Sequence, residues 1–255
     1  MVKEERVELG KLTREDARKR FKKFPLVILP IGSCEQHGPH LPLDTDAHDA
    51  HYVAVEAARR MKSPKPLVLP VLPYGVSLHH LSFSGTVSLT PQTLISVIFE
   101  LAESVKNHGV KALVVVNGHG GNTPSLVAAG QMIKHKLEME FYLYEGWGGG
   151  GKLFGVPDDA HAGAFETSTT LAIRAELVNK SAIPKPVKPS FPIPQTAFSA
   201  EDRVPFAWKT EELSKTGVLG DATKIDIEKA QTFWKRTIDN LVAVLEELRK
   251  HLLRA

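Results

Sequence analysis

Four short apolar runs along the chain have the length and composition of buried β-strands. Each run spans five or six residues; the first three are rich in valine, isoleucine and leucine, and the fourth contains aromatic residues and a leucine. Such continuous apolar runs are typical of strands that are covered on both faces of a sheet. The predicted strands are residues 26–31, 67–72, 112–116 and 140–144.

Longer segments between these runs place apolar residues at helical spacing. These segments are residues 46–61, 91–108 and 124–137, and the last two begin with a proline, which is favoured in the first turn of a helix. Alternating strands and helices require crossover connections, so neighbouring strands run parallel and helices cover both faces. The pattern predicts an α/β fold, a three-layer α/β/α sandwich with a mainly parallel central sheet.

The C-terminal part of the chain departs from this alternation. Residues 183–205 contain six prolines, too many for a helix or a central strand, and we expect a Pro-rich arm on the surface. Before the arm, residues 167–177 have helical spacing, and after it residues 223–253 predict one long terminal helix. Without an internal repeat, the chain is predicted to form a single domain over residues 1–255.

Composition narrows the class of protein. The chain has 42% hydrophobic and 24% charged residues, as globular proteins do, and its net charge of +3 is dispersed, which argues against a nucleic-acid partner. Cys34 is the sole cysteine, so no intrachain disulfide forms. The first 24 residues are densely charged where a signal peptide would need an apolar stretch. We therefore expect a cytoplasmic protein with no membrane association.

Candidate chemistry follows the predicted strands. Ligands of parallel α/β sheets bind at the carboxyl ends of strands, and Glu35 and His37 follow the first strand while His119 follows the third. In an extended loop Glu35 and His37 point the same way, because side chains alternate with a period of two. Asp46 lies nine residues beyond His37, at the start of a predicted helix. Carboxylate and imidazole ligands suit Zn²⁺, Mn²⁺ or Fe²⁺, so these four residues predict a metal site.

Each of these residues also has a plainer interpretation. Asp46 could simply cap its helix. His119 could be a buried histidine that is hydrogen-bonded to backbone. The three glycines around it favour a metal ligand instead, because they let the backbone bend tightly and let another group come close. His48 and His51, three residues apart on one predicted helix, are a weaker alternative metal pair. Cys34 could be a nucleophile beside His37, but a small packed residue is the favoured interpretation.

A third polar segment follows the fourth predicted strand. It contains His161 and Glu166, which offer one more imidazole and one more carboxylate. Glu166 could instead be an acid favoured by the dipole of the following helix, and His161 could be an exposed loop residue. Spacing alone leaves both alternatives open.

Several segments together resemble the creatininase (creatinine amidohydrolase) family. The first is GSCEQHGPHLPLDTD at residues 32–46. The resemblance continues, in the family's order, at residues 74–77, 83–86, 117–122, 161–163, 166–168 and 217–221. Family members are α/β/α proteins, usually hexamers, that hydrolyse cyclic amides, formamides and related bonds at a two-metal site.

The resemblance implies roles for particular residues. Glu35, Asp46 and His119 would hold one divalent metal, and His37 would hold a second with Asp46 as the bridge. Ser77 and His161 would lie on the substrate side. The expected partners are a small-molecule amide and further copies of the same chain, in a homo-oligomer.

One departure from the family pattern concerns the second metal. Creatininase proper has a glutamate two residues after the strand-three histidine, where this chain has Gly121. Either Glu166 replaces it as a ligand or water and substrate complete the site. The loss makes creatinine a doubtful substrate, and formamide hydrolases of archaeal flavin-type cofactor synthesis become equally good comparisons.

A second departure lies near the expected pocket, where His79 and His80 replace the acid and histidine common in the family. We expect His80 near the site and His79 at its rim. Gly120, Gly121 and Trp147 are further expected to line the substrate site.

These observations predict a metal-dependent hydrolase that cleaves a C–N bond of a cyclic amide or formamide. Two divalent ions can activate a water molecule and polarise a carbonyl, with His161 or Glu166 moving the proton. Acceptors that orient the histidine ligands are expected from Asp44, Asn117 and Asn122. Two alternatives are a non-catalytic metal-binding homologue and a metal-dependent enzyme acting on a sugar-like ring.

Overall fold

The central sheet has four parallel strands. The computed structural model describes residues 5–147, 150–156, 158–186 and 188–254, so residues 1–4, 148, 149, 157, 187 and 255 of the predicted domain and arm lie outside the described residues. The strands are β1 (Leu26–Ile31), β2 (Leu67–Val68), β3 (Ala112–Asn117) and β4 (Glu140–Tyr144), in the spatial order β2-β1-β3-β4. Every pairing is parallel, with Leu26 opposite Ala112 and Ala112 opposite Glu140.

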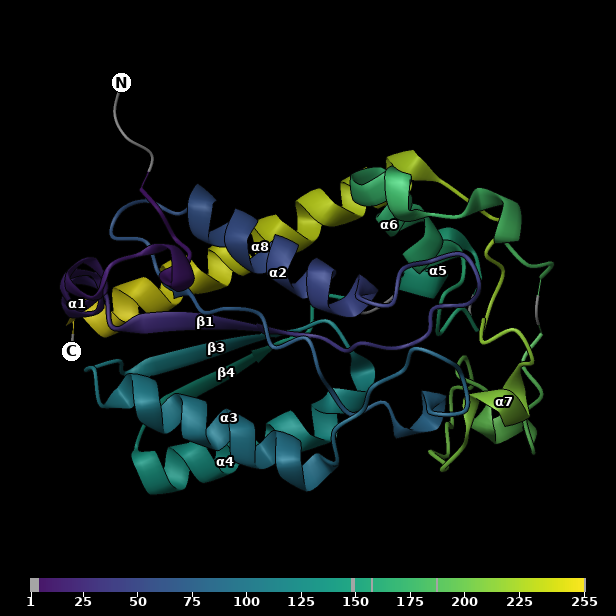
Figure 1. Cartoon of the computed structure of the whole chain (residues 1–255), viewed down its shortest axis with the longest axis horizontal. Coiled ribbons are helices and arrows are strands. Elements are labelled where there is room, and N and C mark those ends of the chain that lie inside the picture. Colours follow the sequence, from purple (N-terminus) through teal and green to yellow (C-terminus); the bar gives the residue numbers. More distant parts are fainter. Residues whose placement is uncertain (1–4, 148–149, 157, 187, 255) are drawn as a thin grey trace.

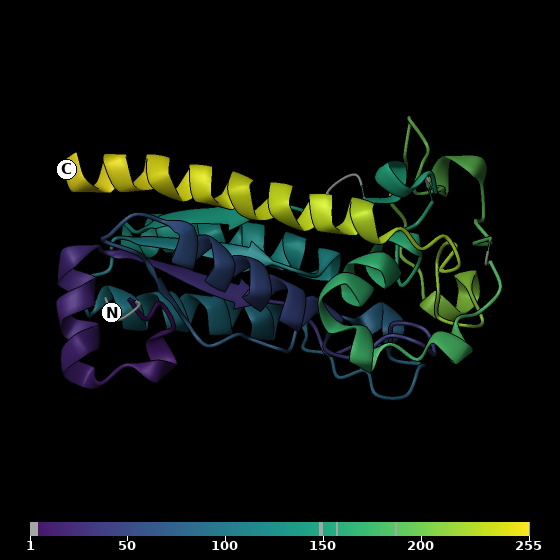
Figure 2. The same cartoon turned by 90° about the horizontal axis from the view of Figure 1, so that it is seen from above.

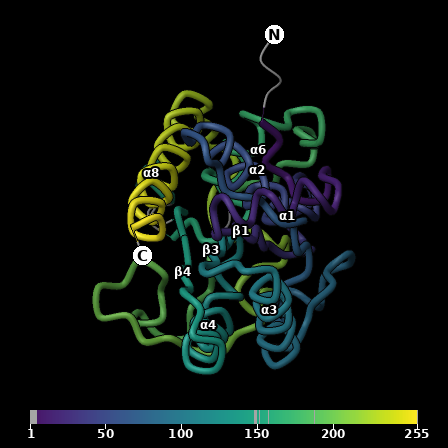
Figure 3. The backbone as a smooth tube through the Cα atoms, turned by 90° about the vertical axis from the view of Figure 1, so that its left-hand side faces the viewer, coloured from purple at the N-terminus to yellow at the C-terminus, as the bar shows by residue number. Residues whose placement is uncertain are grey.

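Helices cover both faces of this sheet and make three layers (Figures 1 and 3). Helices α2 (Thr45–Arg60) and α8 (Ile227–Arg254) lie on one face, and α3 (Pro91–Lys106) and α4 (Thr123–Leu137) lie on the other. Alternate β1 side chains serve the two layers, since Leu26 and Ile28 pack with α2 and α8 while Val27, Leu29 and Ile31 pack with α3 and α4. The predicted α/β/α sandwich is confirmed.

Helix α8 spans the length of the sandwich (Figure 2). Phe233 and Trp234 are buried on its inner side, and Trp234 Nε1 donates to the carbonyl of Thr169, 3.1 Å away. The sequence predicted this helix within a few residues at each end. Helix α1 (Arg14–Lys23) was not predicted from the sequence; its charges form an exposed face, Thr13 caps it, and Phe21 is its buried anchor.

The carboxyl ends of the strands point toward a group of shorter elements (Figure 1). These are α5 (Gly150–Phe154), α6 (Ala164–Arg174) and α7 (Thr210–Leu213). Short 3₁₀ helices lie at Leu9–Lys11, Leu78–His80, Gly120–Asn122, Ala175–Leu177, Lys180–Ala182 and Pro194–Thr196. The last of these is the one regular element found in the described residues of the Pro-rich arm, as the prolines predict.

Two boundaries differ from the sequence prediction for physical reasons. Strand β2 has two residues instead of six, since Pro70 has no amide hydrogen to donate and pairing resumes only as an isolated bridge between Leu72 and Ile31. Helix α6 begins at Ala164, so Glu166 belongs to its first turn instead of preceding it. Among the described residues, no helix is both long and apolar enough to cross a membrane.

Candidate metal centre and substrate pocket

The four residues predicted at the strand ends lie together in one buried cluster. Glu35 and His37 follow β1, Asp46 lies in the first turn of α2, and His119 follows β3; none is more than 7% exposed. Asp46 lies between the two imidazoles, with Oδ1 3.1 Å from His37 Nε2 and Oδ2 3.2 Å from His119 Nδ1. His119 Nε2 is also 3.3 Å from Glu35 Oε2.

Helix capping does not account for Asp46. The N-cap position of α2 belongs to Asp44, and both carboxylate oxygens of Asp46 face imidazoles. Asp46 Oδ2 is buried and accepts no hydrogen bond from the described residues. The position of Asp46 is therefore explained by the cluster.

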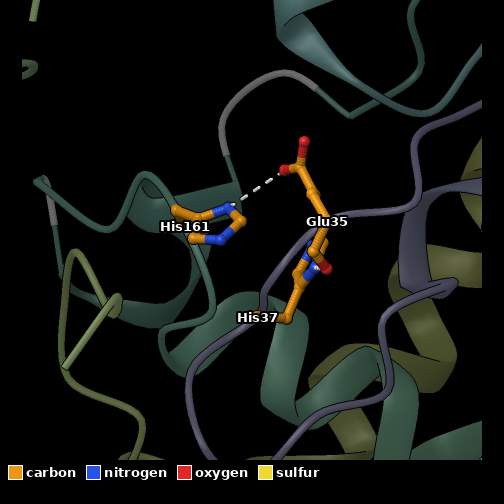
Figure 4. Close-up of side chains that lie close together, drawn as sticks. All are labelled: Glu35, His37 and His161. Atoms are coloured by element: carbon orange, nitrogen blue, oxygen red, sulfur yellow. Dashed lines mark hydrogen bonds and ion pairs between the residues drawn. The ribbon is translucent and has the colours of Figure 1, made fainter. Parts of the chain in front are cut away.

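The third polar segment reaches the same cluster. Glu166 Oε2 lies 3.8 Å from His37 Nε2, and it also accepts a hydrogen bond from the backbone N–H of Ala162. His161 points at Glu35, with Nδ1 3.6 Å from Glu35 Oε1 (Figure 4). His161 is 7% exposed, so the interpretation as an exposed loop residue is wrong.

A backbone carbonyl anchors one nitrogen of each of three imidazoles. A carbonyl can only accept, so His37 Nδ1 donates to Glu35 O (3.1 Å), His119 Nε2 to Val76 O (3.0 Å) and His161 Nε2 to Gln36 O (2.6 Å). The opposite nitrogen of each ring then faces a carboxylate of the cluster. One nitrogen anchored and the other aimed inward is the usual arrangement of a metal-binding histidine.

The acceptors expected for these rings were therefore assigned to the wrong residues. Asp44 forms a two-pronged ion pair with Arg174 of α6, at 2.9 and 3.1 Å. Asn117 Oδ1 accepts from the His119 backbone N–H. Asn122 accepts from the N–H of Val76 and donates to the carbonyl of Gly32. These side chains brace the loops that carry the cluster and do not touch its imidazole nitrogens.

Burial and the short distances between carboxylates and imidazoles shift the pKa values of the cluster residues. Burial alone would lower the pKa of His119, but the neighbouring carboxylates of Glu35 and Asp46 outweigh it and raise that pKa to about 9. Burial raises the pKa of Glu166 to about 7, only partly offset by His37. Burial and the adjacent imidazoles hold the pKa of His161 well below its usual range, so this ring is neutral.

The donor set fits divalent cations. Two groups of three donor residues share Asp46, namely Glu35, Asp46 and His119, and His37, Asp46 and Glu166. A third overlapping group contains Glu35, His37 and His161. Glu35 Oε1 and Asp46 Oδ2 are buried without a hydrogen-bond partner in the described residues, and such orphaned acceptors have a high cost unless a cation satisfies them.

The two neighbouring glycines Gly120 and Gly121 differ in the space around them. A Cβ atom on Gly121 would lie 2.3 Å from Val76 O and 2.4 Å from His119 Nε2, whereas one on Gly120 would meet nothing within 4 Å. Gly121 therefore has a structural role of its own. Its lack of a side chain lets the Val76 carbonyl anchor His119.

A pocket of about 620 Å³ opens above the cluster. Of the predicted substrate residues, Gly120, Gly121, His80 and the rim residue His79 line it. Residues that the sequence reasoning missed form its outer wall: Leu78, Phe198, Arg203, Phe206, Ala207 and Trp208. Most of them belong to the Pro-rich arm or directly follow it, so the arm is a wall of the pocket.

Two predicted substrate residues lie elsewhere. Ser77 is fully buried and its hydroxyl donates to Glu35 Oε2, so it supports a cluster carboxylate and is not part of the pocket lining. Trp147 lines an adjoining cavity of about 880 Å³, and its indole N–H donates to the carbonyl of Asn117. Ser77 was assigned from its place in residues 74–77, one of the segments that resemble the family. That resemblance indicated which part of the site Ser77 is near, but not where its side chain points.

The alternative sites do not converge in the same way. His48 Nδ1 is 3.4 Å from Asp49, whereas His51 Nε2 is 3.5 Å from Glu8, so this histidine pair has separate partners. Cys34 Sγ donates to the carbonyl of Gly85, and burial raises the pKa of its thiol, the opposite of what an activated nucleophile needs.

Comparison with known proteins gives consistent results over nearly the whole chain. The family described as Creatininase: Creatinine amidohydrolase matches residues 10–245. A mycofactocin precursor peptide peptidase of Mycobacterium ulcerans is 32% identical over 249 residues, covering 92% of this chain and 90% of that protein. Creatinine amidohydrolase of Pseudomonas putida is 26% identical, covering 94% and 96%. A solved structure of creatinine amidohydrolase matches with a TM-score of 0.82 at 25% identity, over 95% of this chain and 98% of that one.

Proposed function

The chain belongs to the creatininase family, and from that membership and the buried donor cluster we propose that it is a divalent-metal-dependent amidohydrolase. The family makes it a hydrolase that acts on an amide C–N bond. The observation that carries metal dependence is the position of Asp46, shared by two donor triads and left with an unsatisfied buried oxygen.

We assign the ligands by the two triads that share Asp46. Glu35, Asp46 and His119 would hold one cation, and His37, Asp46 and Glu166 the other, so that Glu166 takes the role of the missing glutamate. Zn²⁺, Mn²⁺ and Fe²⁺ all accept such mixed imidazole and carboxylate sets. When bound, a pair of these cations polarises a carbonyl and lowers the pKa of water.

His161 is the residue that we propose to move the proton. Its Nε2 is fixed by the Gln36 carbonyl, so the neutral ring presents an unprotonated Nδ1 toward the cluster. Such a nitrogen can accept a proton from attacking water and return it to the departing amide nitrogen. Glu166, packed against His37, is better placed as a ligand than as the shuttle.

The size of the cleft favours a substrate larger than creatinine. The pocket above the cluster and the cavity beside Trp147 share Gly118, Gly120, Ala160, Glu166 and Phe198. A cleft that continues on both sides of Glu166 can hold an amide with groups extending in two directions. The relative from Mycobacterium ulcerans is a peptide peptidase, and we propose a peptide-like amide for this chain as well.

Removing metal tests the proposal directly. Dialysis against a chelator is expected to abolish hydrolysis and lower the melting temperature, because the buried carboxylates lose the cations that satisfy them. Refilling with Zn²⁺, Mn²⁺ or Fe²⁺ restores both. Hydrolysis is measured over creatinine, formamides and short peptides, with metal content determined by mass spectrometry. A fully loaded protein that is inert toward the whole panel would overturn the amidohydrolase proposal and leave the non-catalytic homologue and the enzyme of a sugar-like ring as the alternatives.

Substitutions at Glu166 and His161 separate ligand from proton shuttle. Glu166→Gln is expected to reduce the metal content from two ions to one, because the second triad loses a charged donor. His161→Gln is expected to keep the metal content and lower kcat by about 10²- to 10⁴-fold, the usual contribution of a positioned acid or base. Metal analysis and steady-state kinetics on both variants check this; a His161→Gln variant that loses one ion would make His161 a ligand.

A further inference from the structure

The outer wall of the pocket carries a guanidinium group that the proposed chemistry does not use. Arg203 is the one lysine or arginine among the described residues that line the pocket. Its guanidinium carbon lies 5.3 Å from the centre of the Phe198 ring, within the range of a cation–π contact. The arm thus presents a positive charge on an aromatic support.

A continuous aromatic wall connects Arg203 with the metal cluster. Phe198 packs against Trp208 with ring centres 5.8 Å apart, and Trp208 packs against His79 at 4.9 Å. His79 in turn stacks on His119, with ring centres 5.7 Å apart and planes 5° from parallel. A molecule bound along this wall would contact Arg203 at one end and the cluster at the other.

The surroundings of Arg203 suit the binding of an anion. Leu78, Phe206 and Ala207 add apolar atoms to the same pocket lining, and Arg203 itself is exposed, so its guanidinium is open to a ligand. The ion pairs of arginine side chains in the described part of the chain do not include Arg203, although the exposed Glu201 and Asp202 directly precede it. A stacked guanidinium has a planar fork of donors that matches carboxylate and phosphate oxygens.

We propose that Arg203 binds an anionic group of the substrate, a carboxylate or a phosphate, and so selects amides that carry such a group on the arm side of the scissile bond. The inference rests on the proposed function, because it assigns part of the same pocket. It makes Arg203 a specificity residue: the anion is held at the outer wall while the amide lies over the cluster.

Binding of three matched probes tests this assignment separately from turnover. The probes are N-acetylphenylalanine, its neutral carboxamide, and N-acetyl-O-phosphotyrosinamide, titrated calorimetrically into metal-loaded protein at low salt. The wild-type protein is expected to bind one or both anions about tenfold more tightly than the carboxamide, as for a partly exposed charge-assisted pair. The anion that shows the preference identifies carboxylate or phosphate as the source.

Matched variants show whether Arg203 is responsible. Arg203→Gln is expected to remove the preference, and Arg203→Lys to restore only part of it, because a lysine keeps the charge but not the fork. Lys209→Gln removes a nearby charge outside the pocket lining and is expected to leave the preference unchanged. Equal affinities for all three probes, including no measurable binding, or a preference that survives Arg203→Gln, overturn the inference. Failure of the hydrolase proposal would show instead as charge-selective binding without hydrolysis of any amide.

Discussion

Asp46→Asn is expected to abolish hydrolysis and to remove both metal ions. The two oxygens of Asp46 face different imidazoles, His37 at 3.1 Å and His119 at 3.2 Å, so each proposed triad loses its shared anionic donor in one substitution. Loss of an outer partner of a metal ligand costs about 10- to 100-fold in affinity or activity, and loss of the bridge should exceed that. Metal content and kcat/KM measure the effect.

Asp49 provides the matched control. It lies on the same helix and is also buried, and its Oδ1 lies 3.4 Å from His48 Nδ1, a residue outside the donor triads. Asp49→Asn is expected to keep both ions and to change kcat/KM little. An Asp46→Asn protein that retains two ions and wild-type turnover would remove the basis for a shared bridging carboxylate, whatever its melting temperature.

The central sandwich and the residues at the strand ends could be predicted from sequence, because short local patterns determine where the strands begin and end. The continuous apolar runs identified the strands, and the rule that parallel strands present their carboxyl ends at one edge brought Glu35, His37 and His119 together. Asp46 needed more than a pattern, since an aspartate at a helix start is usually a cap. Its expected position next to Glu35 and His37 is what favoured a metal ligand over a helix cap.

The pocket wall could not be predicted because it depends on contacts between distant segments. The prolines predicted an arm without a long helix or a central strand, and its described residues contain one short 3₁₀ helix. Nothing local in the sequence indicates that Phe198 and Arg203 would line a pocket together with the distant residues 78–80. The orientation of each imidazole could not be predicted from the sequence either. It is set by the backbone carbonyls of Glu35, Val76 and Gln36, which carry no side-chain signature.

Gly121→Ala is expected to displace His119 and to empty the first metal site. The added Cβ would lie 2.3 Å from Val76 O and 2.4 Å from His119 Nε2, the two atoms of the hydrogen bond that anchors the ring. Neither can move without breaking that bond, since one is backbone and the other belongs to the ligand. We expect about 1–3 kcal/mol of lost stability from the overlap, a metal deficit of one ion, and a loss of turnover.

Gly120→Ala separates this mechanism from a general effect of the loop. Its Cβ meets nothing within 4 Å, so the variant should keep its metal content and change stability by less than about 0.5 kcal/mol. Thermal unfolding and metal analysis on the two alanine variants make the comparison. If Gly121→Ala bound both ions as tightly as Gly120→Ala, the Val76 carbonyl would not be what aims His119. The position would then be open to a glutamate, as in creatininase proper, and the difference between the two enzymes would be one of ligand set. If the variants diverge as expected, the missing side chain at Gly121 is part of how this chain orients His119.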